Sequence, residues 1–165
     1  MQKSKGNLYV MCGVPGSGKS YLAKQITQTV HTKLISRDEI RFSMLKDGDE
    51  YFAKENLVFH RYMELINKSL KNDQSVIADA THLTPGSRRK LLNNLTVEPA
   101  SIICFYFDLP LDVCLSRNVV RPGREQVPEE TMKSMYENFK PPQYSEGFDY
   151  IYKVDNQQLI LQSEV

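Results

Sequence analysis

The sequence lacks any marked excess of charge. Its 165 residues carry 21 Lys and Arg against 20 Asp and Glu, a formal net charge of +1. This balance excludes a protein that coats nucleic acid through bulk positive charge, and it argues against an acidic disordered chain. The hydrophobic fraction of 41% and the charged fraction of 25% are instead those of an ordinary globular domain.

Long apolar runs and a cysteine framework are also missing. No run approaches the ~18 residues of a membrane span, so we expect no membrane partner. The apolar stretch at residues 8–12 is too short for a signal peptide and predicts a strand. The cysteines, Cys12, Cys104 and Cys114, are odd in number and lack metal-ligand spacing, which favours small buried side chains in a reducing cytoplasm.

The order of the expected elements indicates an α/β fold. With no internal repeat and no linker, residues 1–165 are predicted to form a single domain. Apolar and β-branched runs predict a parallel five-stranded sheet flanked by helices. We expect strands at residues 7–12, 33–36, 75–78, 101–107 and 150–154, and helices at residues 19–30, 38–46, 51–71, 84–95, 110–120 and 128–140.

The longest expected helix, at residues 51–71, carries an aromatic and aliphatic stripe. Its apolar side chains recur at helical spacing on one side, which predicts core packing rather than a ligand-binding face. The stripe consists of Phe52, Phe59, Tyr62, Ile66 and Leu70.

A glycine-rich loop carries the strongest functional signal. Residues 13–20 read Gly-Val-Pro-Gly-Ser-Gly-Lys-Ser and fit G-x-x-x-x-G-K-[ST] between an expected strand and helix. Glycines let successive N–H groups face one anion, while the helix start adds its positive dipole end. Lys19 is predicted to reach the β- and γ-phosphates of ATP, and Ser20 to ligate Mg²⁺. The predicted nucleotide-binding residues in this loop are Gly13, Val14, Pro15, Gly16, Ser17, Gly18, Lys19, Ser20 and Tyr21.

Other signatures narrow the class of nucleotide enzyme. Residues 67–70 approach the guanine-binding N-K-x-D pattern but lack its Asp, and no Asp-x-x-Gly switch or Leu-Ser-Gly-Gly-Gln signature occurs. A small P-loop kinase is the best remaining class.

Asp38 and Arg41 follow the second expected strand. Ligand sites in open α/β sheets form at the carboxyl ends of strands, so Asp38 is placed to accept a proton from an acceptor hydroxyl. Arg41 lies three residues further on, on the same side of the helix, and can hold a substrate phosphate or carboxylate. The alternative for Asp38 is a carboxylate that merely stabilises the helix N-terminus.

Asp79 ends the third expected strand. Its carboxylate is predicted to hold Mg²⁺ or orient Ser20, the alternative being a loop cap. The basic pair Arg88 and Arg89 then fits either the site or a solvated helix face. Among the scattered histidines, only His82 lies near the predicted site.

A third basic group predicts a lid over the phosphates. Arg117 and Arg121 are four residues apart at a helix end, and Arg124 closes a turn before the next helix. A helix, a basic loop and a returning helix over about residues 117–138 make such a lid. The alternative is a set of exposed arginines at a helix C-terminus.

Taken together, these segments resemble the P-loop kinase domain of the phage-type polynucleotide 5′-kinases and their relatives. The resemblance covers residues 8–139, with one departure at Thr81-His82, where that family usually has Thr-Asn. The matching segments are Gly-Val-Pro-Gly-Ser-Gly-Lys-Ser, Ser-Arg-Asp-Glu-Ile-Arg, Asp-Ala-Thr-His-Leu-Thr-Pro, Leu-Ser-Arg-Asn-Val-Val-Arg and Val-Pro-Glu-Glu-Thr-Met-Lys-Ser-Met-Tyr.

The resemblance implies a role for each matching position. Asp38 would be the general base on a 5′-hydroxyl, and Arg41 would grip the neighbouring phosphate of the nucleic acid. Lys19 and Ser20 would serve ATP and Mg²⁺, with the lid arginines Arg117 and Arg121 on ATP.

The expected function is Mg²⁺-dependent transfer of the ATP γ-phosphate to a hydroxyl, with the 5′-OH of a polynucleotide as the leading acceptor. Two alternatives stay open. One is a kinase for a small molecule such as a nucleoside, sugar nucleotide or antibiotic. The other is a non-catalytic ATP-binding module.

Overall fold

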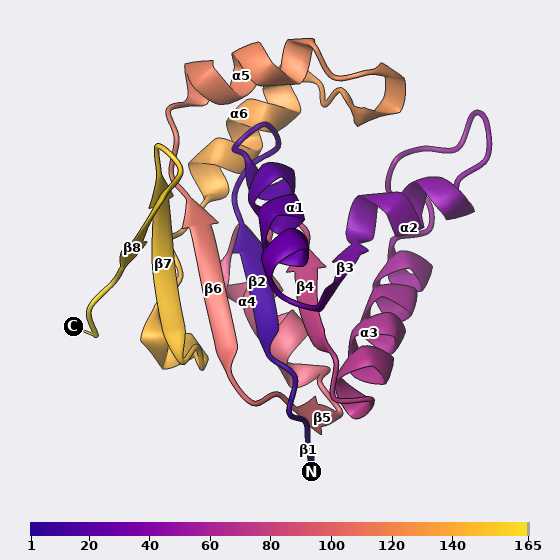
Figure 1. The fold of residues 1–165 in the computed structure, drawn as a ribbon. Helices are drawn as coiled ribbons and strands as arrows, with labels where there is room; N and C mark the ends of the chain where they lie inside the picture. Colours follow the sequence, from indigo (N-terminus) through magenta and orange to yellow (C-terminus); the bar gives the residue numbers. More distant parts are fainter. Residues whose placement is uncertain (165) are drawn as a thin grey trace.

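The computed structural model describes residues 1–164 and has a six-stranded sheet at its centre (Figure 1). The strand order is β3-β4-β2-β6-β7-β8, and every neighbouring pair is parallel except β7 with β8. The five expected parallel strands are therefore confirmed. The strands are β2 (Leu8–Cys12), β3 (Thr32–Ser36), β4 (Ser75–Asp79), β6 (Ile102–Phe107), β7 (Tyr150–Asp155) and β8 (Gln158–Leu161).

Three short strands lie outside the sequence prediction. Strand β8 closes a hairpin with β7 through Asn156 and Gln157, whose φ angles are 45° and 66°. Positive φ at both central residues is the turn geometry that matches the twist of a hairpin. Strands β1 (Gln2–Lys3) and β5 (Val97–Glu98) pair in a separate two-stranded sheet.

Helices cover both faces of the sheet. In Figure 1, α1 lies in front of the strands and α4 behind them, with α3 beside β3 and β4. Along β2, Leu8 and Val10 pack in the cluster that contains α3 and α4 side chains, whereas Met11 packs with Ala23 of α1. This alternation explains why β2 is apolar along its whole length. The helices are α1 (Lys19–Thr29), α2 (Arg37–Met44), α3 (Glu55–Lys71), α4 (Pro85–Asn93), α5 (Leu111–Val119) and α6 (Glu129–Asn138), with single turns η1 (Gly123–Glu125) and η2 (Tyr144–Glu146).

The expected start of the long helix was wrong. Helix α3 begins at Glu55, and residues 51–54 form turns. The Nζ of Lys54 donates to the carbonyl oxygen of Met44 at 2.5 Å, and this hydrogen bond holds the segment against the end of α2 instead of in a helix. Phe52 is consequently 57% exposed rather than in the core. The rest of the stripe is confirmed as core or partly buried packing: Phe59, Tyr62, Ile66 and Leu70.

Arg88 on α4 lies neither on a solvated face nor in the site. Its side chain is fully buried and binds Glu146 through two parallel hydrogen bonds, Nε to Oε2 at 2.7 Å and Nη2 to Oε1 at 2.9 Å. Nη1 donates to the carbonyl oxygens of His82 and Lys140 at 2.9 and 3.0 Å. One guanidinium thus joins α4, the loop after β4 and the segment after α6. Arg89 beside it is exposed, as a solvated face requires.

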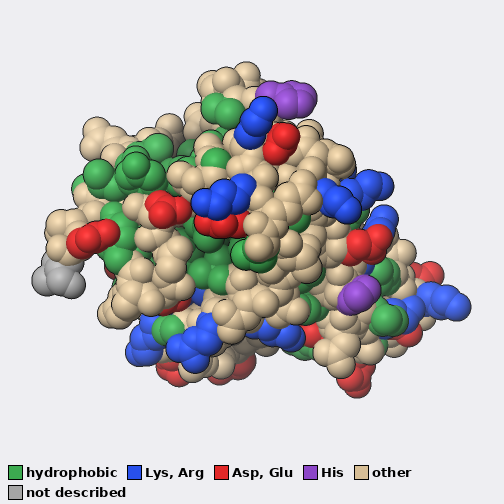
Figure 2. Space-filling model, turned by 90° about the horizontal axis from the view of Figure 1, so that it is seen from below, with side chains coloured by type: hydrophobic (Ala, Val, Ile, Leu, Met, Phe, Trp, Pro, Cys, Tyr) green, Lys and Arg blue, Asp and Glu red, His purple; other side chains and the backbone are tan. Residues whose placement is uncertain are grey.

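The carboxyl ends of the parallel strands all point to one end of the molecule, beneath α5 and α6 (Figure 1). Figure 2 views the molecule from below, and there Lys and Arg side chains are interspersed with Asp and Glu. Within residues 1–164, no helix is both long and apolar enough to traverse a bilayer.

Candidate active site

A pocket of about 910 Å³ lies at the carboxyl ends of β2, β3 and β4. Most of the residues predicted from the sequence line it. They are Pro15, Gly16, Ser17, Gly18, Lys19, Ser20, Tyr21, Asp38, Arg41, Asp79, Arg117 and Arg121. Gly13 and Val14 are not among the lining residues. Val14 is instead buried in a cluster with Cys114 of α5 and Met132 of α6.

The loop between β2 and α1 requires glycine at two positions. Gly16 has φ 80°, and Gly18, the N-cap of α1, has φ 103°. A Cβ on Gly16 would lie 2.6 Å from the carbonyl oxygen of Cys114, so the loop is pressed against α5. This path brings the loop backbone around the N-terminus of α1, an arrangement suited to binding phosphate.

The side chain of Lys19 folds back over the loop that precedes it. Its Nζ donates to the carbonyl oxygens of Gly13 and Val14, both at 2.8 Å. Burial lowers the pKa of Lys19, while the nearby carboxylates of Asp79 and Asp38 oppose that shift. The Oγ of Ser17 is buried and has no hydrogen-bond partner among residues 1–164. A lysine folded over the loop, an unpartnered hydroxyl and a glycine at position 16 whose Cβ would collide with α5 fit a nucleotide phosphate chain.

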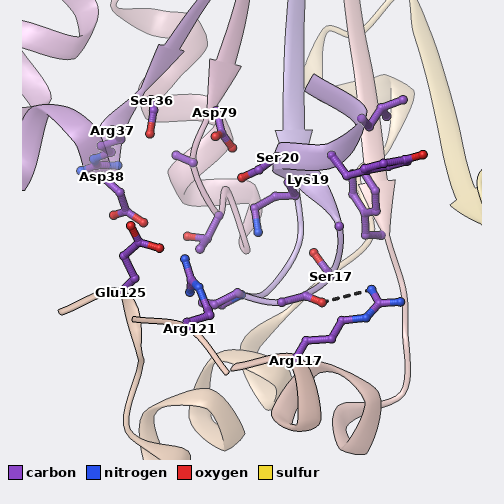
Figure 3. A pocket seen from close by; sticks show the side chains of 18 of the residues that line it. Ser17, Lys19, Ser20, Ser36, Arg37, Asp38, Asp79, Arg117, Arg121 and Glu125 are labelled. Carbon is purple, nitrogen blue, oxygen red and sulfur yellow. Dashed lines mark hydrogen bonds between the residues drawn. The ribbon is translucent and has the colours of Figure 1, made fainter. Parts of the chain in front are cut away.

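Ser20 and Asp79 place side-chain oxygens beside the loop. Figure 3 shows both side chains directed into the same part of the pocket. Burial raises the pKa of Asp79, and Lys19 opposes that shift. Mg²⁺ in kinases is held by few protein oxygens together with substrate phosphates and water. The pair fits that ion, even though residues 1–164 contain no cluster of three or more His, Cys, Asp or Glu ligands.

Asp38 enters the pocket from the first turn of α2, directly after β3. The Nη1 of Arg41 donates to Asp38 Oδ1 and also to the hydroxyl of Tyr51 at 2.9 Å. Its Nη2 donates to Glu55 Oε2 at 2.8 Å, and Arg37 also pairs with Glu55. The Asp38 side chain is 50% exposed, while that of Arg41 is 5% exposed. Both side chains line the pocket, and Asp38 is much the more exposed of the two.

Neighbouring side chains occupy most of the guanidinium of Arg41. Three of its N–H groups are directed to Asp38, Tyr51 and Glu55, and its buried Nε has no partner among residues 1–164. A grip on an acceptor phosphate stays a prediction and has to use the N–H groups that remain.

The predicted lid, residues 117–138, lies across the pocket from Asp38. Arg117 donates from Nη1 to the carbonyl oxygen of Gly16 at 3.3 Å, the dashed line in Figure 3. Figure 3 also shows Arg121 extending into the pocket, and the Glu125 carboxylate facing Asp38. The lid thus brings one arginine to the phosphate loop and a second toward the space above it.

Arg124 has a different place from its two neighbours in the lid. Its Nη2 donates to the carbonyl oxygen of Lys46 at 3.2 Å and to Asp47 Oδ1 at 3.1 Å. It therefore bridges η1 to the loop between α2 and α3, the loop that carries Tyr51.

The sequence interpretation missed Tyr51, Glu55 and Glu125 as pocket residues. Tyr51 and Glu55 were assigned to a regular helix, and nothing local in that pattern indicates their contacts with Arg41. Glu125 lies beside the predicted lid arginines, so its position in the lid was the available signal.

His82 lies below the pocket rather than in its lining. It is 3% exposed, and its Nδ1 lies 2.7 Å from the carbonyl oxygen of Met11. Burial lowers its pKa to about 4, so the imidazole is neutral at pH 7.

Known proteins resemble this chain in sequence and fold. A family model described as an AAA domain matches residues 8–142. The L-seryl-tRNA(Sec) kinase of Methanococcus maripaludis is 31% identical over 142 residues, which cover 82% of this chain and 53% of that protein. A protein of Autographa californica nuclear polyhedrosis virus, named for a bifunctional polynucleotide kinase and RNA ligase, is 25% identical over 149 residues, 82% of this chain and 21% of its own.

Among solved structures, one of the Pnkp1/Rnl/Hen1 RNA repair complex superposes with a TM-score of 0.72 and 25% identity, covering 84% of this chain and 45% of that one. The chain spans about half the length of the tRNA kinase and a fifth of the viral protein.

Proposed function

Because the chain belongs to this AAA domain family and has the fold of P-loop kinases, we propose that it transfers the γ-phosphate of ATP to a hydroxyl acceptor. The acceptor proposed first is the 5′-OH of a polynucleotide. ATP bound with Mg²⁺ supplies the phosphoryl group and part of the charge neutralisation.

The observation that carries the proposal is the convergence of three elements on one pocket. Lys19 comes from the phosphate loop, Asp38 from the end of β3, and Arg121 from the lid. A phosphoryl transfer needs a base at the acceptor, cations at the transferring group and a cover that excludes water. These three residues meet those requirements from opposite sides of the pocket.

Each residue has a stated task. Lys19 and Arg121 would stabilise the charge that spreads over the γ-phosphoryl oxygens, and Arg117 would hold the phosphate loop against the lid. Ser20 and Asp79 would hold Mg²⁺. Asp38 would accept the proton of the acceptor hydroxyl as that oxygen attacks.

The test is a panel of hydroxyl acceptors incubated with ATP labelled at the γ-phosphate. RNA and DNA oligonucleotides with a 5′-OH should receive label, and the same oligonucleotides with a 5′-phosphate should not. Label on nucleosides or sugars instead would establish a small-molecule kinase. Slow hydrolysis of ATP with no labelled acceptor would indicate a non-catalytic ATP-binding module.

A second candidate acceptor is the hydroxyl of a seryl group on tRNA. Two observations favour it: the identity of 31% to the L-seryl-tRNA(Sec) kinase, and the acidic wall of Asp38, Glu39 and Glu125 in the pocket. A carboxylate-lined wall suits the ammonium group of an aminoacyl ester. Charging tRNA with serine before the assay discriminates the two acceptors, because label would then lie on an alkali-labile aminoacyl group.

A further inference from the structure

Tyr51 contacts the proposed base although it lies in a loop. Its hydroxyl donates a hydrogen bond to Asp38 Oδ1 at 2.6 Å and accepts one from Arg41 Nη1 at 2.9 Å. Arg41 Nη1 also donates to the same Oδ1. That oxygen therefore accepts two hydrogen bonds, whereas Asp38 Oδ2 accepts none from side chains or backbone of residues 1–164.

The Tyr51 ring is itself fixed. The Arg41 guanidinium lies over it at 4.3 Å from the centroid, and Phe52 packs edge-on at 4.7 Å between centroids. Phe42 makes a second edge contact at 6.2 Å. Glu55 in turn holds Arg41 from the other side. Such cation–π and aromatic contacts limit the positions the hydroxyl can adopt.

The Tyr51 hydroxyl stays a donor at neutral pH. Burial, together with the hydrogen bond to Asp38, raises the pKa of Tyr51 well above its ordinary value. A half-exposed carboxylate such as Asp38 would otherwise rotate in the pocket, since solvent satisfies either of its oxygens equally well.

We propose that Tyr51 is a positioning residue for the phosphoryl-transfer base. By fixing Oδ1, it leaves Oδ2 directed to the acceptor hydroxyl. This inference rests on the proposed function. In the step it serves, the acceptor O–H bond breaks and its proton passes to Oδ2. The acceptor oxygen forms a bond to the γ-phosphorus, the bond from that phosphorus to the β–γ bridging oxygen breaks, and ADP leaves with the electron pair. The proton on Asp38 then passes to water.

The test is Tyr51→Phe, which deletes one oxygen and keeps the ring that Arg41 covers. A loss of positioning predicts a fall in kcat of ~10- to 100-fold, with the KM for ATP and the melting temperature unchanged. Tyr150→Phe is the matched control, because Tyr150 is a 47% exposed tyrosine on β7. It should leave kcat unchanged.

A double-mutant cycle separates positioning from a general structural role. In an Asp38→Asn background, Tyr51→Phe should lower the residual kcat by less than ~3-fold, because the base it positions is already gone. The inference is overturned if Tyr51→Phe alone leaves kcat unchanged, or if it costs the same factor in both backgrounds. Wild-type protein that labels no hydroxyl acceptor would instead overturn the proposed function itself, and this inference with it.

Discussion

At the scale of single residues, Asp38 is both exposed to the pocket and anchored by its neighbours. Arg41 and Tyr51 bind one of its oxygens, and α2 begins just before it. The alternative that Asp38 only stabilises a helix N-terminus does not account for these contacts.

Replacing Asp38 with Asn should lower kcat by ~10²–10⁴-fold, because the amide cannot accept the acceptor proton. ATP binding should survive, since Lys19 and the phosphate loop are untouched. Steady-state kinetics and equilibrium binding of a fluorescent ATP analogue measure the two effects. Asp112→Asn, at an exposed position of α5, is the control and should match the wild type. Unchanged turnover in Asp38→Asn would remove Asp38 from the mechanism.

His82 makes stability depend on pH. Its pKa is about 4 in the folded protein against 6.5 as the ordinary value. On acidification the unfolded chain therefore binds this proton first. The free energy of unfolding should fall as the pH drops from about 6.5 toward 4, by up to ~3 kcal/mol. Above pH 6.5 this contribution is constant.

Urea unfolding of wild type and His82→Asn across this pH range checks the effect of the histidine. Asparagine tolerates the backbone φ of 42° at this position and does not titrate. Its unfolding free energy should decline less on acidification than that of the wild type. His31→Gln, at an exposed site, should follow the wild-type curve. Parallel curves for wild type and His82→Asn would contradict a neutral buried His82.

At the scale of elements, the arginines of the predicted lid contact two different parts of the molecule. Arg117 and Arg121 belong to the phosphate side of the pocket, whereas Arg124 bonds to the α2–α3 loop. The ion pair of Arg124 with Asp47 is exposed, and exposed pairs contribute ~0–1 kcal/mol. Position within the lid, rather than charge alone, should therefore decide the effect of losing an arginine.

Arg121→Ala should lower kcat by ~10³–10⁵-fold, the range for an arginine that stabilises the transferring phosphoryl group. Arg124→Ala removes the same charge from the same predicted lid and should change kcat by less than ~10-fold. Comparing the two variants at saturating ATP is the measurement. Equal losses would mean that the lid acts through its net charge and not through Arg121.

The junction of α4 with the segment after α6 depends on Arg88. Arg88→Met should lower the free energy of unfolding by ~3–5 kcal/mol, because it leaves Glu146 and two carbonyl oxygens without their buried donor. Arg89→Met, on the exposed neighbour, should change it by less than ~0.5 kcal/mol. Denaturant titration of both variants gives the comparison, and similar values would show that the buried pair contributes nothing.

The elements also show what the sequence could predict. The phosphate loop and the parallel strands were evident because glycines and unbroken apolar runs are local signals. The start of α3 was not evident. The helical spacing of Phe52 with Phe59 continues through residues 51–54, which form turns and are tied to Met44 by Lys54. Likewise, the contact of Glu55 with Arg41 joins residues in different helices, and no local pattern encodes it.

At the scale of the whole molecule, the structure shows how the nearly balanced charges, 21 basic and 20 acidic residues, are distributed. Lys19, Arg117 and Arg121 line the pocket together with acidic residues such as Asp38 and Glu125, and the face seen in Figure 2 also carries charges of both signs. Such a distribution suits the end of one strand rather than a long nucleic-acid footprint. The acceptor should therefore be recognised through few phosphate contacts.

The most direct test of the central claim uses γ-labelled ATP and one oligonucleotide prepared with either a 5′-OH or a 5′-phosphate end. The account predicts that wild-type protein places the label on the 5′-terminal nucleotide of the 5′-OH form alone, and that Asp38→Asn nearly abolishes this transfer. Label released only as inorganic phosphate, with neither oligonucleotide labelled, would contradict a polynucleotide 5′-hydroxyl kinase.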